Sequence, residues 1–207
     1  KGASLVIVDE PEFVSSEKTI LVPDALTTLQ DLAHFHRDNI STHILAIGGS
    51  NGKTTTKELC LAVLSATKKT HATRGNLNNH IGVPLTLLSM TADTEIGIVE
   101  MGANHLKEIA FLCTLCKPDF GYITNFGKAH LEGFGSLEGV IKGKSELYNY
   151  LQTHHKTTFV NPNDGFYGIN YSRFPALFVE AFKEQQEIID EQKSEIDELK
   201  LRLEKLE

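Results

Sequence analysis

The segment GGSNGKTTT, Gly48–Thr56, restricts the possible folds of this chain more than any other part of its sequence. It stands between an apolar run at 43–47, which predicts a buried strand, and a pattern typical of a helix from about Lys53 to Leu64. Consecutive glycines allow a tight turn whose backbone N–H groups point at an anion, and the start of the following helix adds the positive end of its dipole. We therefore expect a phosphate-binding loop between a strand and a helix.

The residues of this loop have separate expected roles. Those expected to contact the phosphates are Gly49, Ser50, Asn51, Gly52, Lys53, Thr54 and Thr55. Lys53 would reach the β- and γ-phosphates, and the Thr54 hydroxyl would bind Mg²⁺. The usual pattern is G-x-x-x-x-G-K-[ST], and Ile47 stands here in place of its first glycine. A nucleoside triphosphate such as ATP, with Mg²⁺, is the favoured ligand, and a glycine-rich turn without a ligand is the alternative.

Short apolar runs alternate with helical patterns over the first 164 residues. We expect strands at 4–9, 19–22, 43–47, 69–73, 96–101, 120–124 and 158–161, and helices at 25–38, 53–64, 83–90, 107–116 and 137–151. Repeated strand–helix units with apolar strands imply a parallel sheet covered by helices. The predicted fold class is α/β, with a parallel P-loop sheet.

The pattern changes after the turn formers NPNDG at Asn161–Gly165. Residues 165–177 read as a linker, and 178–207 as a coiled-coil helix with a seven-residue apolar repeat. Its two seam positions hold Phe182, Ile189, Ile196 and Leu203, and Phe178, Gln185, Gln192, Leu199 and Leu206. An isolated helix would leave this seam in water, so we expect a homo-oligomer; a solitary solvated helix is the alternative.

Composition excludes several classes of protein. The net charge of −7, without a cluster of basic residues, argues against binding to nucleic acid or to an anionic membrane. No apolar run reaches the roughly 18 residues of a membrane span. The 3 cysteines are too few for a disulfide framework, so we expect the cytoplasm. Cys113 and Cys116 form a C-x-x-C pair, interpreted as buried helix cysteines rather than a metal or redox site.

Glu100 follows the apolar run at 96–99, so its carboxylate is expected at the carboxyl edge of the sheet, where open α/β sheets bind ligands. It could give Mg²⁺ an oxygen ligand beside Thr54, although a strand-end carboxylate can also simply face solvent. The segment GNLNN adds three amides that could bond phosphate or substrate, or else form turns: Asn76, Asn78 and Asn79.

Five motifs in this order resemble the central domain of the Mur ligase family. They are GGSNGKTTT, ATRGNLNNHIGVPLTLL, VEMGANHLKEIA, ITNFGKAHLEGFGS and KGKSEL. The resemblance covers about Lys1–Asp164, with 1–40 similar to the end of the family's N-terminal substrate (UDP-binding) domain and 41–164 to part of its ATP-binding central domain. The string EMGANH most resembles the branch that adds D-alanyl-D-alanine to UDP-N-acetylmuramoyl-tripeptide.

The resemblance implies ATP-dependent amide-bond formation through an acyl phosphate, in peptidoglycan precursor synthesis. It implies that His130 binds a second Mg²⁺ and that Asn125 lies by the adenine. It also implies that Lys144 is carbamylated by CO₂ and holds this second Mg²⁺, because an ammonium there would be repelled. Lys144 is preferred to Lys142 for this role, with an ordinary surface lysine as the alternative.

The family text stops near Asp164, and the chain begins with Lys1, so we expect an incomplete enzyme. Residues 167–207 instead resemble the helical stalk of the intramolecular chaperone domains of phage tail fibres. Two classes of function therefore stay open. One is a fragment of a cell-wall peptide ligase, and the other is a coiled-coil oligomerisation module that carries a non-catalytic P-loop body.

Overall fold

The computed structural model describes residues 3–127 and 131–160 of the chain. Their main feature is a parallel sheet of five strands in the order β4-β5-β3-β6-β7. The strands are β3 (His43–Gly48), β4 (Thr70–Ala72), β5 (Ile96–Glu100), β6 (Phe120–Ile123) and β7 (Thr157–Phe159). The predicted parallel α/β fold is confirmed, and the strand ends differ from the predicted ones by one to a few residues.

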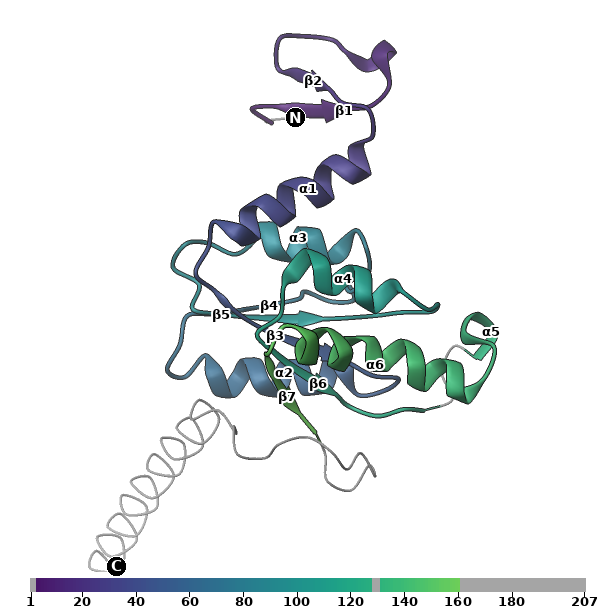
Figure 1. Cartoon of the computed structure of the whole chain (residues 1–207). Coiled ribbons are helices and arrows are strands. Elements are labelled where there is room, and N and C mark those ends of the chain that lie inside the picture. The colour runs from purple at the N-terminus through teal and green to yellow at the C-terminus, as the bar shows by residue number, and fades with distance from the viewer. Residues whose placement is uncertain (1–2, 128–130, 161–207) are drawn as a thin grey trace, which may run out of the picture.

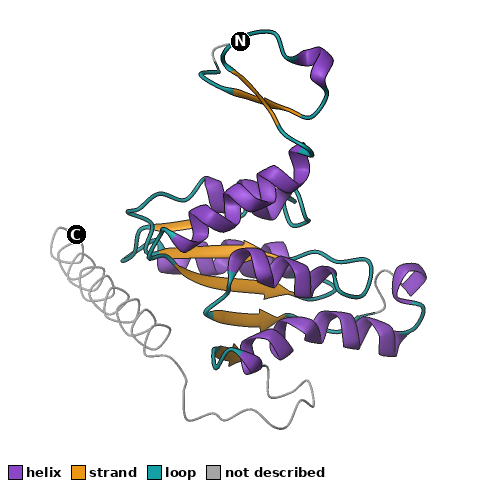
Figure 2. Ribbon diagram, turned by 45° about the horizontal axis from the view of Figure 1, so that its top comes forward, coloured by secondary structure: helices purple, strands orange, loops and turns teal. Residues whose placement is uncertain are grey.

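Helices cover both faces of this sheet (Figure 2). One face carries α3 (Gly82–Leu88), α4 (Glu108–Cys116) and α6 (Leu137–Thr153), with α1 (Ala25–Asp38) packed on α3 and α4, and the other carries α2 (Lys53–Leu64). The single-turn helix α5 (Leu131–Phe134) and the 3₁₀ turn η1 (Pro11–Phe13) were not predicted, because a segment of three or four residues has no measurable periodicity.

The central strand β3 explains why the sequence shows a continuous apolar run there. Ile44 and Ala46 belong to the core beneath α3, α4 and α6, while Leu45 and Ile47 belong to the core beneath α2. Both faces of the strand are therefore buried, as is usual in parallel sheets. This burial fixes β3, and with it the start of the loop at its carboxyl end.

The N-terminal part forms a separate two-stranded parallel sheet, β1 (Val6–Val8) with β2 (Thr19–Leu21), which lies away from the main sheet (Figure 1). Helix α1 joins the two parts. Asp24 caps α1 by accepting the Thr27 N–H at 2.5 Å. Ala33 of the same helix is fully buried in the main core, so α1 packs with the central part of the chain although it falls within residues 1–40.

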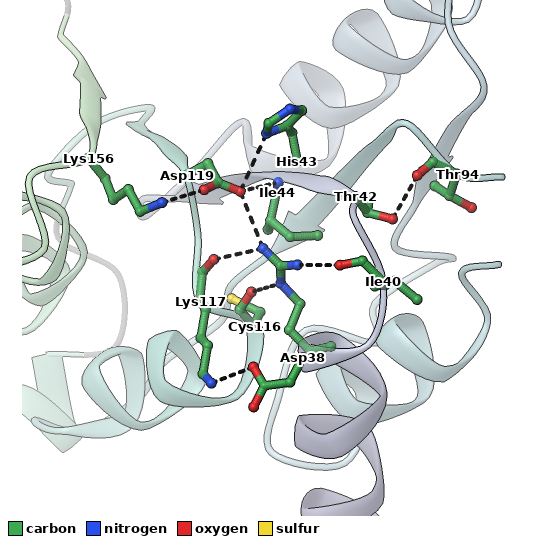
Figure 3. A network of polar contacts seen from close by, with 11 residues as sticks. Asp38, Ile40, Thr42, His43, Ile44, Thr94, Cys116, Lys117, Asp119 and Lys156 are labelled. Atoms are coloured by element: carbon green, nitrogen blue, oxygen red, sulfur yellow. Dashed lines mark hydrogen bonds and ion pairs between the residues drawn. The ribbon is translucent and has the colours of Figure 1, made fainter. Parts of the chain in front are cut away.

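A polar network around Asp119 ties together the amino ends of three strands, as Figure 3 shows. The Asp119 carboxylate accepts the Ile44 N–H at 3.0 Å and lies 3.3 Å from Arg37 and 2.6 Å from Lys156. The Asp119 carbonyl oxygen accepts the Thr157 N–H at 3.1 Å. The network thus holds together the amino ends of β3, β6 and β7. The phosphate-binding loop lies at the opposite, carboxyl end of β3.

The structure describes the residues of some further predictions and not those of others. Cys113 and Cys116 are fully buried in α4, and burial raises the pKa of the Cys116 thiol to about 12, so they are core residues as predicted. The described part of the chain contains no helix long and apolar enough to cross a bilayer. The linker at 165–177, the coiled coil at 178–207 and His130 lie outside the described residues.

Candidate nucleotide-binding site

The loop between β3 and α2 has the conformation that its glycines predict. Gly49 and Gly52 have φ angles of 128° and 79°, which side-chain-bearing residues rarely adopt. A Cβ at Gly49 would lie 2.0 Å from the Thr124 hydroxyl oxygen. Gly52 is the N-cap of α2 and provides no side-chain cap, so no capping side chain occupies the helix start where an anion would bind.

The end of β6 holds this loop in place. The side chain of Asn125 accepts the Asn51 N–H at 3.1 Å and donates to the Asn51 carbonyl oxygen at 3.0 Å. Thr124 donates to the same carbonyl at 2.6 Å, and the Ser50 N–H donates to the Asn125 carbonyl at 3.1 Å. Asn125 therefore contacts the loop itself, and its expected position beside an adenine stays a prediction.

Lys53 folds back over the loop. Its ammonium group donates to the carbonyl oxygens of Gly49 at 2.9 Å and Ser50 at 3.1 Å. Burial lowers the pKa of Lys53, and the carboxylate of Glu100 opposes that shift. A cation held over a turn of backbone N–H groups can exchange these carbonyls for phosphate oxygens.

Glu100 ends β5 beside the start of α2, as predicted. Its side chain is buried, and its two carboxylate oxygens accept hydrogen bonds from the Thr54 hydroxyl at 2.9 Å and the Asn78 amide at 2.8 Å. Both donors are neutral, and none of the ion pairs among the described residues involves Glu100. Nearby positive charge stabilises a buried carboxylate; Lys53 supplies some of it here, and a bound cation would add to it.

These residues fit Mg²⁺. The described ranges contain no cluster of three or more His, Cys, Asp or Glu side chains that could hold a metal by themselves. Mg²⁺ does not need one, because proteins usually bind it through one or two carboxylates together with substrate phosphates and water. The hydroxyl of Thr54 and the carboxylate of Glu100 are hard oxygen ligands at the mouth of the loop, which is the donor set that this mode of binding requires.

Lys144 is buried in α6, unlike the exposed Lys142. Its ammonium group donates to the Ala103 carbonyl oxygen at 3.0 Å and lies 5.3 Å from the centre of the Phe134 ring. Burial, followed by the charge of Lys53, lowers the pKa of Lys144 to about 8 from its usual 10.5, while Glu108 and Glu146 oppose the shift. A neutral amine is the form that reacts with CO₂, and carbamylation of Lys144 stays a prediction.

One cleft of about 400 Å³ is lined by five of the predicted site residues. It is lined by Lys53, Lys144 and the three asparagines of GNLNN, and also by His80, Asn104, Glu108 and Phe111. The predictions that Lys53, Lys144, Asn76, Asn78 and Asn79 share a site are therefore consistent with the structure, although contact with a ligand stays a prediction. Thr54 and Glu100 are linked to this cleft through Asn78.

Asn78 and Asn79 also make hydrogen bonds that stabilise the fold around the cleft. The Asn79 side-chain oxygen accepts the N–H groups of Ile81 at 3.1 Å and Gly82 at 2.9 Å, at the start of α3. Asn78 holds Glu100, and its carbonyl oxygen accepts the Gly102 N–H at 2.8 Å. Both readings of GNLNN, turn formers and site residues, thus have support from the geometry.

Sequence reasoning missed several residues near the site. Glu108 accepts the backbone N–H groups of Asn104 at 2.6 Å and His105 at 3.1 Å, and it shapes the loop after β5. Glu146 accepts the N–H groups of Lys107 at 2.6 Å and Ala110 at 3.0 Å and caps α4 from outside. Asn104 could have been found from its place four residues after Glu100 in EMGANH, whereas the capping roles depend on tertiary contacts.

The fold and the site together define a P-loop α/β domain with a phosphate-binding loop, an acidic strand end and a buried lysine around one cleft. Comparison with known proteins makes the class more specific. Residues 47–198 match the family model described as the Mur ligase middle domain, and the chain belongs to this family. The match continues past Asp164, where the sequence motifs end, into residues outside the described part of the chain.

Two similar curated proteins have the same name. The chain is 43% identical over 153 residues to the UDP-N-acetylmuramoyl-tripeptide--D-alanyl-D-alanine ligase of Bacillus subtilis, an alignment covering 73% of the chain and 34% of the relative. It is 41% identical over 150 residues to the protein of the same name from Escherichia coli, covering 72% and 33%. The chain thus spans about a third of the length of the curated relatives it matches.

Solved structures agree with the fold. A crystal structure of MurF from Acinetobacter baumannii has a TM-score of 0.65 at 38% identity, covering 70% of this chain and 32% of that one. The MurF ligase of Thermotoga maritima, solved in complex with ADP, has a TM-score of 0.66 at 31% identity, covering 76% and 41%.

Proposed function

We propose that this chain is the ATP-binding part of a ligase that adds D-alanyl-D-alanine to UDP-N-acetylmuramoyl-tripeptide in peptidoglycan precursor synthesis. The observation that carries the proposal is the buried Glu100 carboxylate, hydrogen-bonded to the Thr54 hydroxyl directly after the glycine-rich loop. The names of the similar proteins and the ADP complex of one of them support the substrates.

The reaction needs an activated carboxyl group, because a carboxylate is a poor electrophile. A carboxylate oxygen of the peptide substrate attacks the γ-phosphorus of ATP, the bond to the β-phosphate oxygen breaks, and ADP leaves. The amine of D-alanyl-D-alanine then attacks the acyl carbon, phosphate leaves, and the nitrogen loses a proton to give the amide. Bound Mg²⁺ would supply positive charge to the phosphate oxygens during the transfer.

The residues of the chain divide this work. Backbone N–H groups of 49–55 and the ammonium of Lys53 would hold the phosphates, while Thr54 and Glu100 would hold the first Mg²⁺. Lys144, once carbamylated, would turn from a cation into an anion and hold a second Mg²⁺ together with His130. Asn76, Asn78 and Asn79 line the same cleft as Lys144, and we assign them to the peptide substrate.

The division of the chain is part of the same proposal. Residues 1–40 would belong to the substrate domain, 41–164 to the ATP-binding domain, 165–177 to a linker and 178–207 to a coiled coil that forms a homo-oligomer. The free, buried thiols of Cys113 and Cys116 fit a reducing cytoplasm.

Calorimetry with ATP and MgCl₂ tests the proposal on the whole chain. We expect binding by the wild type, and loss of measurable binding in Lys53→Ala. Lys69→Ala is a suitable control, because Lys69 is exposed and pairs with Asp93 at 3.2 Å. Unchanged affinity in Lys53→Ala would remove the proposed function.

The alternative, an oligomerisation module, makes a different prediction. Sedimentation of a chain that ends before Phe178 should then show fewer chains per particle than the full chain, once the particle mass is divided by the mass of one chain. An unchanged number of chains per particle would exclude assembly through the coiled coil, whatever the result with ATP.

A further inference from the structure

Lys57 is a buried lysine that has no role in the proposed reaction. Its side chain is 0% exposed, one helical turn after Lys53 on α2. Its ammonium group donates to the Thr73 carbonyl oxygen at 2.7 Å and lies 2.9 Å from a carboxylate oxygen of Glu58, whose side chain is 59% exposed. Because burying a charge is costly, a lysine kept here in full burial needs a reason beyond helix formation.

Thr73 connects Lys57 to the end of β5. It follows β4 directly, and its N–H donates to the Ile98 carbonyl oxygen at 2.9 Å. Its hydroxyl oxygen accepts the backbone N–H of Glu100 at 3.0 Å. Lys57 therefore holds Thr73 in place, and Thr73 in turn holds the backbone of Glu100.

The side chain of Glu100 is held from the same two elements. Thr54 of α2 and Asn78 of the loop after β4 each donate to one carboxylate oxygen. The bond from Lys57 to Thr73 joins α2 to the first residue of that loop. Helix, loop and carboxylate thus form one hydrogen-bonded unit, in which a shift of Thr73 would move the backbone of Glu100 relative to Thr54.

We infer that Lys57 is a positioning residue for the Glu100 carboxylate, acting through Thr73, and that it sets how strongly Mg²⁺ strengthens nucleotide binding. The inference rests on the proposed function, in which Glu100 and Thr54 hold the metal. Residues that orient metal ligands commonly change metal affinity by roughly 10- to 100-fold when they are replaced. A purely structural lysine would change stability and leave the effect of Mg²⁺ unaltered.

The test measures binding of adenylyl imidodiphosphate, a non-hydrolysable ATP analogue, to the full chain by calorimetry, once with MgCl₂ and once with EDTA. The ratio of the two affinities is the magnesium effect, and it does not depend on overall stability while the protein is folded. We expect Lys57→Met to reduce this ratio by roughly tenfold, with the affinity in EDTA within about twofold of the wild type.

A second pair of variants keeps the test decisive if Lys57→Met does not fold. Thr73→Val removes the hydroxyl that holds Glu100 and should reduce the ratio similarly, whereas Thr73→Ser retains the hydroxyl and should preserve it. If the wild type does not bind the analogue at all, the proposed function fails. If the wild type shows a magnesium effect and a folded Lys57→Met keeps it within about twofold, the inference about Lys57 is overturned and the proposed function stands. If Lys57→Met does not fold, an effect that Thr73→Val keeps within about twofold overturns the inference.

Discussion

Replacing Lys144 by methionine should stabilise the folded chain at neutral pH and change how its stability depends on pH. Folding lowers the pKa of Lys144 from 10.5 to about 8. At about 1.36 kcal/mol per pH unit, holding the ammonium in its buried site costs up to ~3 kcal/mol near pH 7. The variant also loses the bond to Ala103 and the contact with Phe134, so we expect a net gain of about 1–2 kcal/mol.

The sign of the pH dependence follows from proton binding. Between pH 8 and 10.5 the unfolded chain binds more protons at Lys144 than the folded chain, so wild-type stability rises with pH in this window. From pH 7 to pH 9 the wild type should therefore gain about 1 kcal/mol relative to Lys144→Met. Urea denaturation at pH 7, 8 and 9, in buffers free of CO₂ to prevent carbamylation, measures this difference.

The exposed Lys142, two residues earlier on the same helix, is the matched control. The difference between the wild type and Lys142→Met should stay constant with pH. If the difference between the wild type and Lys144→Met also stays constant, or grows as pH rises, the account of a buried and perturbed lysine at this position is wrong.

Three further predictions concern the same site. In ¹³C-bicarbonate at pH 8, NMR should show a carbamate resonance in the wild type and in Lys142→Met but not in Lys144→Met; a signal that survives in Lys144→Met would contradict carbamylation there. Gly49→Ala should lower the free energy of unfolding by about 2–4 kcal/mol, whereas Gly75→Ala, with a positive φ but open space around it, should cost about 1 kcal/mol; equal losses would count against the close approach at Gly49. Asn125→Ala should weaken nucleotide binding about tenfold by calorimetry, because two hydrogen bonds to the loop are lost, and unchanged affinity would show that the loop does not depend on them.

The sequence predicts the fold well where the local signal is strong. Strands β3 and β5 are apolar runs that need burial on both faces, and α1, α2 and α6 have long apolar stripes, so their positions follow from periodicity. The order of the strands in the sheet cannot be read from periodicity, because it depends on the side of β3 on which each later strand is added. Helix α5 was missed because four residues carry no periodic signal.

The site was predictable only in part for a similar reason. Gly49, Lys53, Thr54 and Glu100 lie in motifs whose spacing carries the chemistry, so their meeting at one sheet edge could be expected. Lys57 reads in the sequence as an ordinary helical lysine. Its burial depends on how β4 packs against α2, and that information is not local.

A nucleotide-bound structure tests the central claim most directly. The full chain would be crystallised with adenylyl imidodiphosphate and Mn²⁺ in place of Mg²⁺, and the metal located by its anomalous scattering. The account predicts the phosphates against the N–H groups of 49–55 and a metal peak about 2.0–2.3 Å from the oxygens of both Thr54 and Glu100. A nucleotide bound elsewhere, or a metal that does not touch Glu100, would contradict it.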